Sequence, residues 1–426
     1  MKVLIKKGHL LNPATDTDGI YDILVEDEII KKIDKEIPEE GECRVINAEN
    51  MYVMPGFIDL HVHLRDPGLT HKETIETGAK AAARGGVTTI CPMPNTKPST
   101  DNPEIVKEVV LRAEKEACVT LLPVGAVTIG QMGKEVTDIK GMKKAGICAI
   151  SEDGKSVMDS NVYREAMKLA KECEIPVMAH CEDINLVNGG VMNLDDKASE
   201  LGLKGISNAV EDIIVARDIL LAKETGARLH LCHCSTKDSV RMIKEAKEEG
   251  LPVTGEVCPH HFILSTDDIK ENDANYKMNP PLRSKEDVKA LAEGLRDGIM
   301  DVISTDHAPH TEEEKSGGFE KAPFGIVGLE TSAALTYTER VLKGFLTPMQ
   351  MVEKMSYNPA RILSIDRGNV DEGKVADLVI FNPNCEYEID VNKFASMGKN
   401  TPFNGRKVTG RVECTIHRGK IVFQES

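Results

Sequence analysis

The middle of the chain alternates between short apolar runs rich in β-branched residues and longer segments with helical periodicity. The apolar runs predict strands at Phe57–Leu60, Val87–Cys91, Val119–Val124, Ile147–Ile150, Ile175–Ala179, Arg228–Cys232, Pro252–Val257 and Asp301–Ser304. Capping signals mark the helices between them, as at Ser284-Lys285-Glu286-Asp287 before a predicted helix over Asp287–Arg296. Strands and helices that alternate about every 30 to 50 residues favour a (β/α)8 TIM barrel over a doubly wound open sheet, both α/β folds.

The two ends of the chain differ from the middle because they consist of short strands and turns. Predicted strands lie at Lys2–Lys6, Ile20–Val25, Ile29–Ile33, Cys43–Asn47, Ala376–Phe381, Val412–His417 and Lys420–Gln424. We expect one small β-sandwich built from both termini, with two unrelated β appendages as the alternative. The predicted division is 1–52 and 369–426 for the sandwich and 53–368 for the (β/α)8 barrel.

Composition restricts the classes of function. The chain has 426 residues, of which 41% are hydrophobic and 29% charged, values typical of soluble globular proteins. The formal net charge of −16 argues against general nucleic-acid binding, and no apolar run approaches the ~20 residues of a membrane helix. The 11 cysteines lack CxxC pairs, and the start lacks a secretory signal. We therefore expect a cytoplasmic protein with no nucleic-acid or membrane partner.

Polar side chains follow seven of the eight predicted barrel strands. These strand ends carry His61-Val62-His63, Pro94-Asn95, Glu152-Asp153, His180, His233, His260-His261 and Asp306-His307. In a TIM barrel the carboxyl ends of all strands meet at one face, where catalytic groups gather. So many chemically active residues at corresponding positions favour the barrel over the open sheet.

The spacing of His61 and His63 places both imidazoles on one side of an extended strand, where they can bind one metal ion. His180, His233, Asp153 and Asp306 add further imidazole and carboxylate ligands. This set suits Zn²⁺, while Mn²⁺, Co²⁺ and Fe²⁺ remain open from ligand type alone. More ligands than one tetrahedral site needs predict a binuclear centre with a bridging carboxylate.

The other histidines and cysteines near the strand ends are expected to play no metal-binding part. In an extended strand Cys232 and Cys234 project away from His233, which argues against thiolate ligation. At the seventh strand end we expect one of His260 and His261 to be structural and neither to be a ligand. His230 is expected to be background.

The segment Pro55–His63, read as PGFIDLHVH, resembles the amidohydrolase superfamily, and Leu64-Arg65-Asp66-Pro67-Gly68 narrows the resemblance to class I dihydroorotases. Further similarity lies in the motifs MPNT at 93–96, MNPPLR at 278–283, STDHAPH at 304–310 and GKVADL at 373–378. Hydantoinases and allantoinases share the two histidines, but Arg65 is similar to the arginine that holds a substrate carboxylate in dihydroorotases. A catalytically inactive barrel that scaffolds a partner enzyme is the alternative from another class.

The resemblance implies a role for each matching residue. His61 and His63 would hold a first metal ion with Asp153, and His180 and His233 a second that shares Asp153 as bridge. Asp306 would bind the first metal and act as general acid and base. The substrate-binding residues implied are Arg65, Asn95 and His310 for the carboxylate, and Asn279 with the backbone of Phe324 and Gly325 for the ring.

The implied activity is reversible cyclisation of N-carbamoyl-L-aspartate to L-dihydroorotate in pyrimidine (UMP) biosynthesis, by a hydroxide held on two zinc ions. Some relatives bridge their metals with a carboxylated lysine, so Lys155 is kept as the alternative to Asp153. The segment 311–321 is expected to be a mobile, solvated loop, either plainly exposed or an active-site lid. A homodimer and a complex with aspartate transcarbamoylase are expectations that rest on the resemblance alone.

Overall fold

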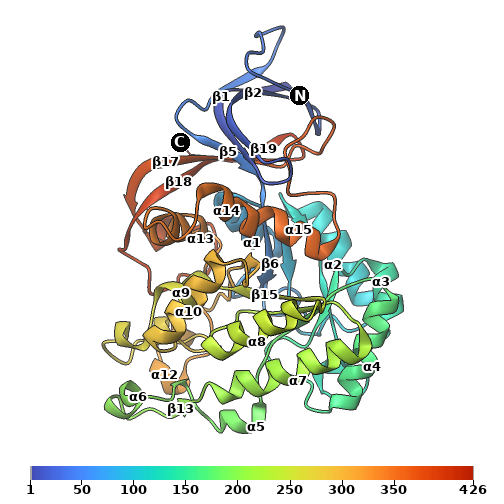
Figure 1. Ribbon diagram of the computed structural model, residues 1–426, viewed down its shortest axis with the longest axis vertical. Coiled ribbons are helices and arrows are strands. Elements are labelled where there is room, and N and C mark those ends of the chain that lie inside the picture. The colour runs from blue at the N-terminus through green and yellow to red at the C-terminus, as the bar shows by residue number, and fades with distance from the viewer. Residues whose placement is uncertain (1, 426) are drawn as a thin grey trace.

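The apolar runs of the middle segment form the parallel wall of a barrel in the computed structural model, which describes residues 2–425 (Figure 1). The wall strands are β6 (Phe57–Val62), β7 (Val87–Pro92), β8 (Thr120–Leu121), β9 (Val124–Ala126), β10 (Ala149–Ser151), β11 (Val177–Ala179), β14 (Leu229–Leu231), β15 (Val253–Val257) and β16 (Val302–Ile303). They pair in the orders β6-β7-β8 and β9-β10-β11-β14-β15-β16. The barrel closes where His63 N donates to His307 O at 2.8 Å, beside the parallel bridge of Val62 and His307.

The third predicted strand is present but divided into β8 and β9. Pro123 lies between the two halves and has no N–H to give to a ladder. The first half pairs with β7 and the second with β10. Leu122 N still donates to Ile90 O, and Pro123 O accepts from Cys148 N, so the wall stays continuous through the break.

Helices cover the outside of the wall, and their amphipathic faces supply its packing partner. They are α1 (Ile75–Arg84), α2 (Pro103–Glu116), α3 (Ile139–Ala145), α4 (Ser160–Glu172), α7 (Ala209–Thr225), α8 (Lys237–Glu248) and α10 (Lys285–Arg296). The predicted capping box is confirmed, with Ser284 as the N-cap and Asp287 completing the box, and the helix begins at Lys285, two residues before the predicted start at Asp287.

The two ends of the barrel are covered by different segments. After β16 the chain forms α13 (Ser332–Thr336), a π-helical turn (Tyr337–Val341), α14 (Pro348–Val352), a second π-helical turn (Glu353–Tyr357) and α15 (Asn358–Leu363). Ser356 donates to the carbonyl of Gly56 before β6, and Asn358 donates to the carbonyl of Asp301 before β16. This segment therefore covers the amino-terminal ends of the strands.

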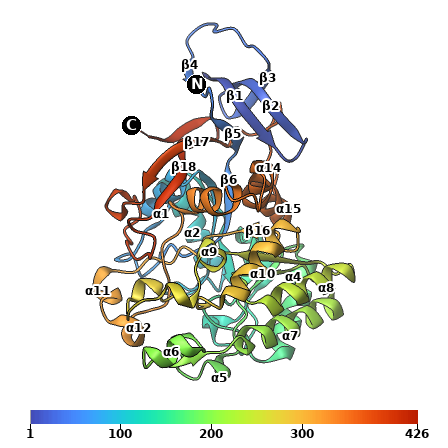
Figure 2. The same cartoon turned by 60° about the vertical axis from the view of Figure 1, so that its left-hand side comes forward.

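Short elements gather over the carboxyl ends. They are a 3-10 turn (Ile129–Gln131), α5 (Ile184–Val187), β12 (Met192–Asn193), α6 (Asp196–Glu200), β13 (Gly205–Ile206), α9 (Pro259–Ile263), two more 3-10 turns (Thr266–Asp268 and Ala274–Tyr276), α11 (Glu312–Lys315) and α12 (Gly318–Lys321). Figures 1 and 2 place α5, α6 and α12 at the end of the molecule remote from both chain termini.

Both termini build one sheet, as predicted. Its strands are β1 (Lys2–Asn12), β2 (Thr17–Glu26), β3 (Ile29–Asp34), β4 (Arg44–Asn47), β5 (Tyr52–Pro55), β17 (Leu378–Glu388), β18 (Lys407–His417) and β19 (Lys420–Gln424), with a 3-10 turn at Val391–Lys393. The order is β19-β18-β17-β5-β1-β2-β3, with β4 on β1, so the antiparallel pair β5–β17 joins the two ends of the chain. The β-sandwich is confirmed and two unrelated appendages are excluded, while the domain boundaries at 52/53 and 368/369 stay a prediction.

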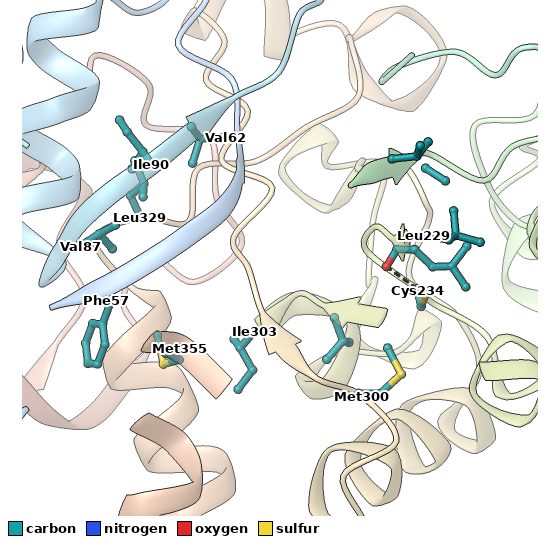
Figure 3. Close-up of a cluster of buried hydrophobic side chains, with 14 of the residues drawn as sticks. Phe57, Val62, Val87, Ile90, Leu229, Cys234, Met300, Ile303, Leu329 and Met355 are labelled. Atoms are coloured by element: carbon teal, nitrogen blue, oxygen red, sulfur yellow. Dashed lines mark hydrogen bonds between the residues drawn. The ribbon is translucent and has the colours of Figure 1, made fainter. Parts of the chain in front are cut away.

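Separate apolar cores support the two parts. Val3, Ile23 and Val53 from the N-terminal strands pack with Ile380 and Ile416 from the C-terminal ones inside the sandwich. The larger core lies between the barrel wall and its helices. Figure 3 shows part of it, including Phe57 and Val87 from β6 and β7 and Leu329 and Met355 from the segments after β16.

Within residues 2–425, no helix combines the length and the apolar character needed to cross a bilayer.

We predict that Ile380→Ala destabilises the protein by about 2–5 kcal/mol, because it opens a cavity where N- and C-terminal strands meet. Ile380 is 1% exposed, whereas Ile20 on β2 is 49% exposed and serves as the matched control. Urea denaturation of both variants tests this, and Ile20→Ala is expected to change stability by about 0.5 kcal/mol or less. Equal effects of the two substitutions would contradict a shared sandwich core.

Candidate metal centre

The carboxyl ends of the barrel strands bring imidazoles and carboxylates from five strands to one point. The residues are His61 and His63 at the end of β6, Asp153 after β10, His180 after β11, His233 after β14 and Asp306 after β16. Each is at most 6% exposed. These six side chains therefore lie close together, as the sequence predicted. Their roles as metal ligands remain a prediction.

His61 and His63 face the two aspartates from the same side of their strand. The Nε2 atom of His61 lies 3.1 Å from Asp153 Oδ1 and 3.6 Å from Asp306 Oδ1. The Nε2 atom of His63 lies 3.0 Å from Asp306 Oδ1 and 3.5 Å from Asp153 Oδ2. One imidazole pair therefore shares both carboxylates.

A second imidazole pair faces Asp153 alone. Asp153 Oδ1 lies 3.5 Å from His180 Nδ1 and 3.7 Å from His233 Nε2, and these two nitrogens are 2.9 Å apart. Asp153 is thus the carboxylate between the two pairs. Burial by itself raises the pKa of Asp153, but the imidazoles of His61, His180 and His233 outweigh it and hold the pKa well below its ordinary value.

The far nitrogens of three imidazoles are fixed by oxygen acceptors. His61 Nδ1 donates to Glu256, His63 Nδ1 donates to Asn95 Oδ1 at 2.9 Å, and His180 Nε2 faces Glu182 at 3.4 Å. Each such contact places the proton on the outer nitrogen and leaves the inner nitrogen with a free lone pair. This is the arrangement that a histidine needs in order to bind a metal.

The donor set fits divalent cations. His61 Nε2 is buried and has no hydrogen-bond partner among the described residues. The donor atoms of His61, His63 and Asp306 lie within 4.8 Å of one another, and so do those of His61, Asp153 and His233. Buried, unpaired imidazole nitrogens beside carboxylates are costly unless a cation completes them.

Glu256 on β15 is a functional residue that the sequence reasoning missed. Its Oε1 accepts from His61 Nδ1 at 3.0 Å and from the backbone N of His233 at 3.1 Å. Its Oε2 accepts from His230 Nε2 at 3.0 Å and from Ser304 Oγ at 2.7 Å. An ionisable residue within the apolar run Pro252–Val257 was the available signal. One carboxylate therefore connects His61 and His233 of the cluster to neighbouring strands.

The expectation that His230 is background is wrong. The residue is fully buried, donates to Glu256 and has Thr254 Oγ1 at 2.9 Å from its Nδ1. It points into the barrel because it alternates with Leu229 and Leu231 along β14. His230 helps to hold Glu256 rather than facing the aspartates.

The histidines of the seventh strand end group with Cys258 rather than with the two aspartates, whereas the Sγ atom of Cys232 lies within 4.8 Å of donor atoms of His61 and Glu256. Burial raises the pKa of the Cys232 thiol, which disfavours the thiolate. His261 Nε2 donates to Pro280 O at 2.8 Å, and burial lowers the pKa of His260 to about 4. The donor atoms of Cys258, His260 and His261 do lie within 4.8 Å of one another, a grouping that the sequence did not reveal.

Arg65 is a buried cation without a counter-ion. It is 9% exposed, and no carboxylate of residues 2–425 lies within ion-pair distance of it. Its Nε donates to Pro309 O at 3.2 Å, and its Nη2 lies 3.2 Å from His310 Nε2. Burial lowers the pKa of the guanidinium, although Asp306 and Asp153 oppose this shift. The guanidinium is therefore not part of a surface ion pair, and the side chain is left free to bind an anion.

His310, Phe324 and Gly325 lie next to Arg65. His310 Nε2 donates to Phe324 O at 2.9 Å, and burial together with the charges of Arg65 and Lys72 lowers the pKa of His310 to about 3. The imidazole is therefore neutral near pH 7. Gly325 has φ of 127°, and a Cβ there would approach the Ala308 side chain to 2.6 Å, so glycine is required.

Asn95 and Asn279 lie on different sides of the cluster. Asn95 Oδ1 accepts from His63 Nδ1, and its Nδ2 donates to Asp153 Oδ2 at 3.2 Å. Asn279 donates to Glu182 Oε1 at 2.9 Å. Glu182, two residues after His180, was not singled out from the sequence. Burial by itself raises the pKa of Glu182. The hydrogen bond and the charge of His180, together with the hydrogen bond from Asn279, outweigh burial and hold this pKa below its ordinary value.

Lys155 does not face the cluster. The chain turns at Gly154, where φ is 78°, and Lys155 Nζ donates to Gln131 O at 3.0 Å. Asp153 rather than Lys155 thus lies between the imidazole pairs.

The expectation that 311–321 is solvated along its length is wrong. The segment contains α11 and α12, Phe319 is 1% exposed, and the ammonium of Lys315 is buried. Lys315 Nζ donates to the carbonyls of Lys277, Pro323 and Gly325. Movement of the segment 311–321 as an active-site lid stays a prediction.

Solved structures of the same architecture identify the class. An L-hydantoinase (dihydropyrimidinase) from Arthrobacter aurescens is 29% identical and superposes with a TM-score of 0.90, covering 100% of this chain and 96% of that one. The barrel, the sandwich and the cluster of imidazoles and carboxylates thus define a cyclic amidohydrolase.

Sequence comparison then gives the family. A dihydro-orotase-like family model matches residues 51–239. A dihydroorotase from Acetivibrio thermocellus is 46% identical over 423 residues, 99% of both chains. A dihydroorotase from Pelotomaculum thermopropionicum is 47% identical over 425 residues, 100% of this chain and 99% of the relative. The chain belongs to the dihydroorotase family.

We predict that Glu256→Gln weakens metal binding about 10- to 100-fold, because an amide oxygen cannot replace both carboxylate oxygens among four donors. Chelator competition followed by metal analysis measures this. Asp218→Asn is the matched control, since Asp218 is equally buried but pairs with Arg217 on the outer helix α7. Wild-type metal affinity in Glu256→Gln would show that Glu256 only fills space.

Proposed function

We propose that the chain is a zinc-dependent dihydroorotase that interconverts N-carbamoyl-L-aspartate and L-dihydroorotate in pyrimidine biosynthesis. The observation that carries this proposal is the buried, unpaired guanidinium of Arg65 next to a cluster of imidazoles and carboxylates. Both proposed substrates carry a carboxylate beside the amide bond that is made or broken. A buried arginine beside the cluster favours these carboxylate-bearing substrates over neutral cyclic amides.

His61 and His63 would hold one zinc ion together with Asp306, and His180 and His233 would hold the other. Asp153 lies between the two imidazole pairs and would be shared by both sites. When bound there, zinc supplies an acidified water near neutral pH and polarises a carbonyl oxygen. Occupation of both positions, rather than one, is part of the proposal because Asp153 faces both pairs.

Asp306 is the proposed general acid and base. In the hydrolytic direction its carboxylate takes a proton from the attacking water and delivers it to the departing ring nitrogen, as the C–N bond breaks and a C–O bond forms. In the cyclising direction it removes a proton from the carbamoyl nitrogen as the C–N bond forms, and returns this proton to the carboxyl oxygen, whose C–O bond breaks as it leaves as water. Burial raises the pKa of Asp306, but His63, His61 and His233 outweigh it and lower the pKa, so the carboxylate is ionised and ready to accept.

The remaining residues position the substrate. Arg65 would pair with its carboxylate through two parallel hydrogen bonds, with Asn95 and His310 beside it. Asn279 and the backbone of Phe324 and Gly325 would contact the ring. The neutral imidazole of His310 adds no second positive charge, so Arg65 sets the charge preference of this subsite.

A hydantoinase activity is the second candidate, favoured by the structural similarity to L-hydantoinase. Arg65 distinguishes the two, because a hydantoin without a carboxylate leaves the guanidinium buried and unpaired. Cytoplasmic location, a homodimer and a complex with aspartate transcarbamoylase stay predictions.

We predict that exhaustive chelation abolishes dihydroorotate hydrolysis and that Zn²⁺ restores it, because the carboxylate of Asp306 alone cannot acidify the water or polarise the carbonyl as a bound cation would. Ring opening of L-dihydroorotate and of an unsubstituted hydantoin is measured in parallel, with circular dichroism as the control for folding. Full activity in protein shown to be metal-free would refute the proposal. A protein that holds no metal when purified and gains no activity with Zn²⁺ would point to a scaffold.

We predict that Arg65→Met strongly impairs cyclisation of N-carbamoyl-L-aspartate. Loss of one partner from a buried charge pair costs about 2–5 kcal/mol, which lowers kcat/KM by roughly 30-fold to several thousandfold. Metal content is expected to remain unchanged. Arg241→Met, at a surface position that is 55% exposed, is the control. Activity that survives in Arg65→Met would show that the substrate carboxylate binds elsewhere.

A further inference from the structure

Glu182 lies between a metal-facing imidazole and a substrate-facing amide. Its Oε1 accepts from Asn279 Nδ2 at 2.9 Å, and its Oε2 lies 3.4 Å from His180 Nε2. The carboxylate is largely buried, with 12% of its side chain exposed. It is the only described side chain that contacts both residues through its oxygen atoms.

The backbone around Glu182 is fixed from the neighbouring strand end. Ser156 Oγ donates to His180 O at 2.7 Å and accepts from the N–H of Glu182 at 3.1 Å. The Ser156 hydroxyl thus forms hydrogen bonds to the backbone at both ends of the turn 180–182. The position of the carboxylate therefore follows from the fold and does not depend on a flexible rotamer alone.

A carboxylate can only accept hydrogen bonds, and this determines both neighbours. His180 must carry its proton on Nε2, which leaves Nδ1 with a lone pair toward Asp153 and His233. Asn279 must turn its NH2 group toward Glu182, so its Oδ1 faces away. No described residue donates to that oxygen, and Asn279 is half-buried.

We propose that Glu182 is a positioning residue that sets both the tautomer of His180 and the orientation of the Asn279 amide. The free Oδ1 of Asn279 then accepts an N–H from the substrate, which selects cyclic ureides over rings that present a carbonyl or ether oxygen at that place. This inference rests on the proposed function for the identity of the ring.

A glutamine at position 182 cannot perform both tasks. Its amide has one accepting and one donating end, whereas His180 and Asn279 both need an acceptor. The metal-facing contact is the stronger constraint, so the oxygen of the introduced glutamine is expected to accept from His180. The NH2 group of that glutamine then turns toward Asn279, whose amide rotates and presents NH2 to the substrate instead of oxygen.

The test is a double-mutant cycle of Glu182→Gln and Asn279→Asp in the metal-loaded enzyme. Glu182→Gln is expected to retain its metal and to raise KM for dihydroorotate about tenfold or more. Asn279→Asp alone sets two carboxylates face to face and raises KM further. In the double variant the introduced glutamine donates its NH2 to one oxygen of the introduced aspartate and leaves the other oxygen as acceptor. Its KM is therefore expected to fall about fivefold or more below that of Asn279→Asp.

Two further variants separate the tasks without relying on turnover. Glu182→Ala removes the acceptor from His180 and is expected to weaken binding of Zn²⁺ about 10- to 100-fold, measured by chelator competition. Asn279→Ala is expected to keep full metal affinity and raise KM. Glu248→Gln on the exposed face of α8, where 65% of the side chain is accessible, controls for loss of one negative charge.

The inference is overturned if Glu182→Gln or Asn279→Ala has a KM within twofold of wild type. It is equally overturned if the double variant is no better than Asn279→Asp. Should Glu182→Gln fail to fold, as judged by thermal unfolding, the metal affinity of Glu182→Ala and the KM of Asn279→Ala decide, and a wild-type value in either overturns the inference. A wild-type enzyme that does not open dihydroorotate refutes the proposed function instead, and the metal affinity of Glu182→Ala still tests the contact with His180.

Discussion

The burial of Asp153 among four imidazoles is the interaction on which the rest of the site depends. A carboxylate removed from water needs compensating positive charge or hydrogen bonds, and imidazoles removed from water need acceptors for their outer N–H groups. The barrel meets both requirements, because Asp153 faces His61 and His180. Glu256 and Glu182 then accept the outer protons. The cluster is therefore one connected polar network, in which each carboxylate limits what its neighbours can do.

Strained backbone conformations accompany this network. Arg65, His233 and Asp306 have φ values of 59°, 33° and 49°, in the left-handed region that non-glycine residues rarely occupy. Such conformations cost about 1–3 kcal/mol each and persist where surrounding contacts enforce them. All three residues lie two or three positions after the end of a barrel strand, where the chain turns away from the wall. The hydrogen-bonded strands of the barrel hold these turns in their strained conformations.

The ligand cluster could be predicted because strand ends recur at regular intervals and His61-Val62-His63 has an unambiguous spacing. Glu256 and Glu182 could not, since their importance lies in contacts with residues 195 and 97 positions away in the chain. Arg65 was identified through its motif, but its lack of a counter-ion is visible only in space. The break at Pro123 and the buried anchor of Lys315 were missed because strand continuity and lysine burial depend on tertiary partners rather than local pattern.

The antiparallel pairing of β5 with β17 has a consequence for biosynthesis. During translation β5 emerges long before its partner, because more than three hundred residues of barrel separate Pro55 from Leu378. Until the last strands leave the ribosome, the nascent chain presents one unpaired strand edge and half of an apolar core. A product that ends before β17 would keep this strand edge unpaired, and an unpaired edge is a template for pairing with other chains.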